Sequence, residues 1–125
     1  MDDRGAAPFC YLTTSGRVSG RPHTIEIWFA LADRTLYLLS GGRDGSDWVR
    51  NLLADPEVTV RIGRRDAPAL AARARVVAPG SGEDDLARRL VTDKYQPGYG
   101  GDLSSWRRSS LPVAVDLAPE ADRVG

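Results

Sequence analysis

Two glycine-rich stretches hold most of the side chains that could do chemistry. The first, TTSGRVSGRPHT, covers residues 13–24 and contains two arginines, two glycines and the only histidine of the chain, His23. Arg17 and Arg21 are the informative pair, because guanidinium groups beside the N–H groups of a glycine-rich turn form a good anion site. The same glycines also suit a plain β-hairpin turn. The stretch therefore predicts either a hairpin or a phosphate cradle.

The second stretch, SGGRDGSDWVRNL, begins at Ser40. Gly41 and Gly42 follow the end of a predicted strand, where backbone N–H groups can approach a ligand that a Cβ would keep away. Such donors suit a ring that gains negative charge when it carries a hydride. Trp48 and Asn51 lie three residues apart in a predicted helix, so they share one side of it and could hold the face and the edge of a heterocycle. The alternative is an ordinary turn before a helix, with the indole in the core.

Conventional catalytic centres find no support in the sequence. One histidine and one cysteine, Cys10, give no ligand spacing for a metal and exclude an intrachain disulfide. His23 has no evident serine or cysteine partner, so a nucleophile triad is not predicted. What remains are glycine loops, arginines, aromatic rings, and amide or hydroxyl groups. This set suits a planar, phosphorylated cofactor that performs the chemistry itself.

The composition limits the class of protein. With 125 residues we expect a single domain, 1–125, in which residues 1–8 and 119–125 form flexible ends. Seventeen Lys and Arg balance seventeen Asp and Glu, so no global field attracts nucleic acid. No apolar run approaches the length of a membrane span, and the acidic start is unlike a signal peptide. These features together predict a cytoplasmic protein.

Alternation of apolar and polar residues places the two stretches in a mainly β fold. A period of two residues predicts strands with one buried face. Capping serines predict helices at 46–53 and 81–91, and the segment 96–106 has too much glycine and proline for either element, so we expect a mobile loop there. Closure of short antiparallel strands removes exposed edges, which favours a small barrel with two helices in its connections. The six predicted strands cover residues 9–14, 24–31, 35–40, 58–62, 70–76 and 113–117.

The two stretches, joined by a strand ending in LLSGG and followed by WVRNLLADPEVTVRIG, resemble a known family. This is the split-β-barrel family of flavin- and deazaflavin-dependent oxidoreductases, which is related to the pyridoxamine phosphate oxidases and includes actinobacterial deazaflavin-dependent nitroreductases. The match runs from about Tyr11 to Ile62, and the remainder fits more loosely. The resemblance implies a six-stranded antiparallel split β-barrel of the FMN-binding type, with two short helices, that pairs into a homodimer.

The resemblance also implies roles for the residues of the first stretch. Arg17 and Arg21 would pair with the phosphate of the cofactor, Ser19 and backbone amides would complete the cradle, and His23 would also bind the cofactor. The implied cofactor is the deazaflavin coenzyme F-420. Deazaflavin members of the family usually carry lysine where Val18 stands, and FMN is therefore the alternative cofactor.

In the second stretch, the resemblance places Ser40, Gly41 and Gly42 against the tricyclic ring. The helix that carries Trp48 and Asn51 would close over the site.

The implied reaction is transfer of a hydride from the reduced cofactor to a quinone, a nitroaromatic or another conjugated acceptor. Tyr95, Tyr99 and Trp106 are candidates for a substrate lid, and the hydroxyl of Tyr95 or Tyr99 is a candidate proton donor. Their other interpretation is aromatic packing over a barrel end. Two alternatives to an enzyme stay open at this point: a barrel that binds FMN, haem, a bilin or a lipid without catalysis, and a purely structural dimer.

Overall fold

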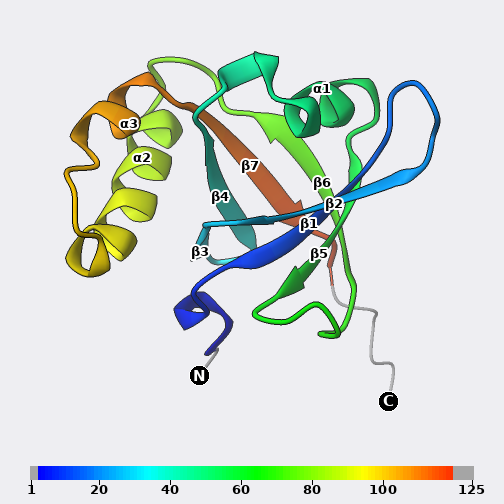
Figure 1. Cartoon of the computed structure of the whole chain (residues 1–125), viewed down its shortest axis with the longest axis horizontal. Coiled ribbons are helices and arrows are strands. Elements are labelled where there is room, and N and C mark those ends of the chain that lie inside the picture. The colour runs from blue at the N-terminus through cyan, green and yellow to red at the C-terminus, as the bar shows by residue number, and fades with distance from the viewer. Residues whose placement is uncertain (1–2, 120–125) are drawn as a thin grey trace.

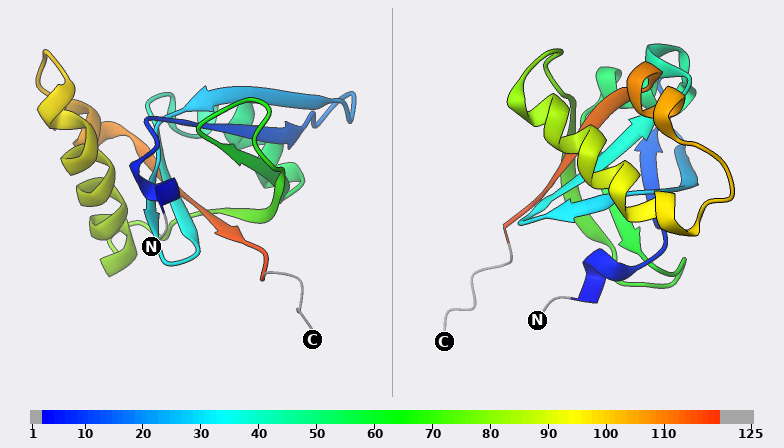
Figure 2. Two further views of the ribbon diagram at one scale, coloured as in Figure 1. Left: turned by 90° about the horizontal axis from the view of Figure 1, so that it is seen from below. Right: turned by 90° about the vertical axis from the view of Figure 1, so that its left-hand side faces the viewer.

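The computed structural model describes residues 3–119, and its main element is one seven-stranded antiparallel sheet. The strand order is β2-β1-β5-β6-β7-β4-β3. The two outer strands, β2 and β3, are consecutive in the chain and separated only by Trp28 and Phe29, so the sheet curls back on itself (Figures 1 and 2). The strands are β1 (Cys10–Ser15), β2 (Pro22–Ile27), β3 (Ala30–Ala32), β4 (Thr35–Ser40), β5 (Glu57–Ile62), β6 (Leu70–Val76) and β7 (Leu111–Leu117).

The α-helices lie in the connections between strands, on one side and at one end of the curled sheet, whereas a short 3-10 helix precedes the first strand (Figure 1). The α-helices are α1 (Asp47–Ala54), α2 (Gly82–Tyr95) and α3 (Ser104–Ser109); the 3-10 helices are η1 (Asp3–Ala6), η2 (Arg43–Gly45) and η3 (Gln96–Gly98).

The mainly β, antiparallel architecture predicted from the sequence is confirmed, but the number of strands was wrong by one. The predicted strand 24–31 is two strands, because the chain leaves the ladder at Trp28 and Phe29. The backbone N–H of Phe29 donates to the Tyr95 hydroxyl (3.0 Å), and its carbonyl accepts from the Lys94 ammonium (2.9 Å). Side chains of α2 thus replace the sheet partners that the break removes.

The prediction of a loop over 96–106 was also wrong in part, because η3 and the start of α3 fall inside it. Two side chains organise the segment. The Gln96 side chain donates to the Gly101 carbonyl (2.7 Å) and accepts from the Leu103 N–H (2.9 Å), and the Asp102 carboxylate accepts from the Ser104 N–H (2.9 Å) at the start of α3. These local hydrogen bonds supply the order that the glycines alone would not.

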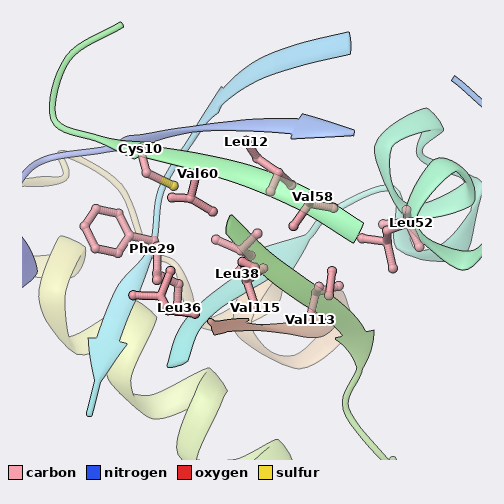
Figure 3. Packing of buried hydrophobic residues seen from close by; sticks show 14 of the residues in the cluster. Cys10, Leu12, Phe29, Leu36, Leu38, Leu52, Val58, Val60, Val113 and Val115 are labelled. Atoms are coloured by element: carbon pink, nitrogen blue, oxygen red, sulfur yellow. The ribbon is translucent and has the colours of Figure 1, made fainter. Parts of the chain in front are cut away.

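The core fills the inside of the curled sheet (Figure 3). Phe29 and Leu12 are fully buried there, and Val49 and Leu52 of α1 close one end of it. Cys10 belongs to the same cluster, and burial raises the pKa of its thiol to about 12, so it is an unreactive packing residue at neutral pH. A second cluster lies outside the sheet, where Ala87 and Val91 of α2 pack on β3, β4 and β7.

The ends of the chain are described only in part. Of the two ends expected to be flexible, residues 1–8 and 119–125, positions 1–2 and 120–125 lie outside the described residues, whereas 3–8 are described and include η1. Within the first of them, the carbonyls of Ala7 and Pro8 accept hydrogen bonds from Lys94 (2.7 Å) and Tyr95 (2.8 Å). The same two residues of α2 therefore hold both the entry to β1 and the break between β2 and β3.

An ion-pair network ties the first turn of α2 to the sheet. The Arg75 guanidinium donates to both carboxylate oxygens of Glu83 (2.7 and 2.8 Å) and to Asp116 (2.8 Å). The Tyr37 hydroxyl donates to Glu83 as well (2.7 Å). These bonds, first that of Arg75 and then that of Tyr37, lower the pKa of Glu83 from its ordinary value of 4.5 to about 2.

The network predicts a stability that is lost in acid. Because the pKa of Glu83 is lower in the folded state, its contribution is present above pH 4.5 and disappears as the pH falls toward 2. We expect Glu83→Gln to lower the free energy of unfolding at pH 7 by about 1 kcal/mol, since both partners are partly exposed, and to flatten its dependence on pH in that window. Urea denaturation at several pH values measures both effects.

Glu57→Gln is the matched control, because Glu57 pairs with Arg73 on the open surface with both side chains 68% exposed. It is expected to change the stability by less than about 0.5 kcal/mol. Equal pH profiles for the two variants would contradict the role assigned to Glu83.

Candidate functional site

The first glycine-rich stretch forms the hairpin between β1 and β2, which projects beside α1 (Figure 1). The Gly16 N–H donates to the Arg21 carbonyl (2.7 Å), and the Gly20 N–H donates to the Gly16 carbonyl (2.8 Å). Gly20 has a φ of +74°, which a residue with a side chain rarely adopts. The Ser19 hydroxyl accepts from the Arg21 N–H (3.1 Å). The predicted hairpin is therefore confirmed, and the turn uses several of its own backbone donors.

Asn51 of α1 holds this hairpin in place. Its side-chain oxygen accepts from the Arg17 backbone N–H (3.2 Å) and guanidinium (2.9 Å), and its side-chain nitrogen donates to the Thr14 hydroxyl (3.1 Å). Asn51 is 3% exposed. The Asn51 side chain, which was predicted to meet the edge of a heterocycle, thus forms its hydrogen bonds with other residues of the protein.

Beside this contact lies a cavity of about 210 Å³, which we call the hairpin cavity. It brings together Arg17, Ser19, His23 and Asn51, all of which the sequence singled out. Arg21, the second predicted phosphate partner, has an exposed side chain and is not part of the lining. The volume is suited to a phosphate group rather than to a tricyclic ring. The full lining is Gly16, Arg17, Val18, Ser19, His23, Asp47 and Asn51.

The second glycine-rich stretch forms the turn between β4 and α1. Ser40 is 2% exposed, and its hydroxyl donates to the Arg43 carbonyl (2.9 Å) and lies 2.9 Å from the Ser46 hydroxyl. A Cβ at Gly42 would lie 2.5 Å from that same Ser46 oxygen, so a side chain here would displace the Ser46 hydroxyl from its contact with Ser40. The Ser40 side chain therefore points into the turn and stabilises it through these hydrogen bonds.

The turn also packs against α3. A Cβ at Gly41 would lie 3.4 Å from the indole nitrogen of Trp106, and the Arg43 guanidinium donates to the Ser109 carbonyl (2.7 Å). The turn thus separates the hairpin side of the molecule from an aromatic cluster on its other side.

That cluster is arranged around Trp28. The indole stacks on Tyr95 with a centroid distance of 4.2 Å and an interplanar angle of 5°, and it meets Tyr99 and Trp106 edge to face at 5.9 and 5.8 Å. A cavity of about 580 Å³, which we call the aromatic cavity, lies beside it. Its lining consists of Trp28, Tyr99, Asp102, Leu103, Ser105, Trp106 and Ser109.

Sequence reasoning missed Trp28. The period of two placed it on the outer face of a strand, beside the buried Phe29. A tryptophan on an outward face was the available signal, because so large a ring needs a cover or a ligand.

The three predicted lid residues divide into two groups. Tyr99 and Trp106 line the aromatic cavity, whereas Tyr95 does not. The Tyr95 hydroxyl donates to the Pro8 carbonyl (2.8 Å) and accepts from the Phe29 N–H, and burial raises its pKa to about 12. Tyr99 is 47% exposed, and within residues 3–119 its hydroxyl has no hydrogen-bond partner. Of the two candidate proton donors, Tyr99 is the one whose hydroxyl is available.

Trp48 lies in neither cavity lining and packs against the core cluster. Its position agrees with the packing alternative considered for the second stretch.

Across the described part of the chain, no three His, Cys, Asp or Glu side chains gather as they would around a metal ion, and no helix is long and apolar enough to cross a membrane.

Comparison with known proteins places this arrangement in a family. Residues 4–118 match the family described as F420H(2)-dependent quinone reductase. The chain belongs to this family. It is therefore an oxidoreductase that uses the deazaflavin coenzyme F-420, as the resemblance implied.

Solved structures share its fold. A protein described as an F420 reductase is 20% identical with a TM-score of 0.65, and the alignment covers 94% of this chain and 92% of that one. An FAD-binding protein from Mesorhizobium loti is 16% identical with a TM-score of 0.67 and coverage of 92% and 82%. A protein described as a domain-swapped dimer is 18% identical with a TM-score of 0.66 and coverage of 89% and 80%.

The residues present fit this coenzyme in two ways. The hairpin cavity has the size and the guanidinium that a phosphate requires, and the aromatic cavity has the size and the flat walls that a ring requires. The turn between them contains Gly41, Gly42 and Gly45, which have no side chains to cover its surface.

The Asn51 contact predicts a stability effect that can be measured. Asn51→Ala leaves the buried Thr14 hydroxyl and the Arg17 N–H without their partner, so we expect the free energy of unfolding to fall by about 1–3 kcal/mol. Chemical denaturation measures this. Arg50→Ala, on the exposed side of the same helix, is the control and is expected to stay within about 0.5 kcal/mol of the wild type. An equal loss for both variants would show that the amide does not anchor the hairpin.

Proposed function

We propose that this oxidoreductase transfers a hydride from reduced coenzyme F-420 to a quinone, a nitroaromatic or another flat conjugated acceptor. The observation that supports it is the pair of cavities on either side of the Ser40–Ser46 turn, one suited to phosphate and one walled by aromatic rings. The coenzyme, when bound, supplies the hydride. The protein contributes positions and hydrogen-bond donors rather than an acid and base pair.

The hairpin cavity would hold the phosphate. Arg17 offers a guanidinium there, and Ser19 offers a hydroxyl. Arg21 has an exposed side chain that can reach the more distant charges of the same ligand. Charge-assisted hydrogen bonds of this kind are the strongest available to a phosphate at a protein surface.

The turn and the aromatic cavity would hold the ring and the acceptor. Gly41 and Gly42 leave room beside Trp106, while Ser40 keeps the turn in shape. Trp28 and Trp106 present flat apolar surfaces that suit a conjugated acceptor and reject a bulky saturated one. A quinone that accepts a hydride also needs a proton, and the Tyr99 hydroxyl, from the lining of the aromatic cavity, would donate it.

We also propose that the protein acts as a homodimer in the cytoplasm, without a nucleic-acid partner. One structural neighbour is described as a domain-swapped dimer, and β2 is an edge strand whose first residues are exposed. A mass in solution near twice 13.6 kDa would support the dimer, and a mass of 13.6 kDa would contradict it.

Turnover with purified protein tests the reaction. We expect reduced coenzyme F-420 to be oxidised when menadione is added, because the aromatic cavity accepts a flat quinone, and the recovery of coenzyme fluorescence follows the rate. Reduced FMN in place of the deazaflavin is the comparison and is expected to give little or no turnover. Binding of the coenzyme without any turnover on quinones or nitroaromatics would contradict the proposed acceptors.

Tyr99→Phe tests the proton donor in the same assay. We expect kcat to fall by roughly 100-fold with an unchanged Kd for the coenzyme, which is the usual size of a general-acid contribution. Tyr95→Phe is the matched control. It is expected to cost about 1–3 kcal/mol of stability, because the Phe29 N–H loses its acceptor, and to keep kcat near the wild-type value. Full activity in Tyr99→Phe would remove the role assigned to that hydroxyl.

A further inference from the structure

The hairpin cavity contains a carboxylate where an anion is to bind. Asp47, the first residue of α1, lines the cavity, and its carboxylate lies 3.1 Å from the Arg17 guanidinium. The other terminal nitrogen of that guanidinium donates to Asn51 (2.9 Å) and lies 3.5 Å from the Asp47 carbonyl. Both terminal nitrogens of Arg17 are thus already used by α1.

The ion pair between Arg17 and Asp47 determines the net charge that a phosphate would meet in the hairpin cavity. Arg17 and Asp47 are the two formally charged side chains in the lining, and their charges cancel. Val18, at the tip of the hairpin, is 95% exposed and contributes no charge. With His23 neutral, a phosphate that enters the cavity meets a net charge of zero and a carboxylate beside its best partner.

The ion pair between Arg17 and Asp47 is weak enough to be broken by a ligand. The side chains of Arg17 and Asp47 are 32% and 85% exposed, and an exposed pair of this kind shifts an equilibrium by roughly fivefold or less. A carboxylate at the first turn of a helix is stabilised by the helix dipole, so Asp47 keeps a favourable environment when it turns to solvent. A phosphate offers Arg17 shorter, charge-assisted hydrogen bonds in return.

We propose that Asp47 competes with the phosphate of the coenzyme for Arg17. The inference rests on the proposed function, which assigns the phosphate to the hairpin cavity. In the free protein the Asp47 carboxylate holds the guanidinium in the cavity, and phosphate binding displaces it. Asp47 thereby lowers the affinity for the coenzyme and speeds its release, which suits a hydride donor that is exchanged after use.

A simple structural latch is the competing explanation of the same contact. A latch would hold the hairpin against α1, and its loss would weaken coenzyme binding. Asn51 already performs this task through the Arg17 backbone and Thr14, and it is buried whereas Asp47 is not. The two explanations therefore predict opposite signs for the removal of the Asp47 charge.

Titration of the coenzyme by fluorescence, at about 50 mM salt to limit screening, separates them. Asp47→Asn is expected to lower the Kd for coenzyme F-420 roughly fivefold, the range of an exposed pair. Asp85→Asn removes the same charge from an exposed position in the first turn of α2, outside both cavity linings, and is expected to change Kd less than about twofold. The gain is expected to vanish with the deazaflavin nucleoside that lacks the phosphate, and in an Arg17→Ala background. Asp47→Ser serves as a second variant that suits the start of a helix.

The outcomes distinguish this inference from the proposed function. Coenzyme binding with an unchanged or raised Kd in Asp47→Asn and Asp47→Ser would overturn the competition alone. An equal gain in Asp85→Asn would overturn it too, because general electrostatics would then explain the effect. A wild-type protein and variants that all fail to bind the coenzyme would reject the proposed site, and the inference with it.

Discussion

The side-chain amide of Asn51 is the contact on which the arrangement of the site depends. It is buried, and it satisfies the Thr14 hydroxyl and the Arg17 N–H of the hairpin with one group of α1. Because α1 directly follows the turn after β4, this contact brings the two glycine-rich stretches to the same end of the molecule. An amide whose oxygen and nitrogen are both paired inside the protein is costly to remove, so the geometry of the hairpin cavity is well defined before any ligand arrives.

The break between β2 and β3 determines the position of the aromatic residues beside the aromatic cavity. The curled sheet has its two outer strands joined at Trp28 and Phe29, and the backbone of that junction is held by Lys94 and Tyr95 of α2. Phe29 enters the core while Trp28 is left outside, stacked on Tyr95. Because these two neighbouring side chains point in opposite directions, Phe29 fills the interior and Trp28 forms a wall of the aromatic cavity.

Local rules account for much of what the sequence revealed. The period of two identified most of the sheet, capping serines marked the starts of α1 and α2, and glycines with two arginines marked the hairpin. What stayed hidden depends on residues far apart in the chain. The break at Trp28 requires Tyr95, and the orientation of Asn51 requires the hairpin, whereas helical spacing specifies a face and not a partner. For the same reason helical spacing does not predict that Asp47 pairs with Arg17, which lies in the hairpin.

We propose that one coenzyme spans the hairpin cavity and the turn after β4, and hydrogen exchange of the backbone amides can detect such binding at both segments at once. Saturating coenzyme F-420 is expected to slow exchange at residues 16–21 and 40–46 together, with little change in β6, which lines neither cavity. Protection confined to one of the two segments, or centred on an element away from both cavities, would contradict the account.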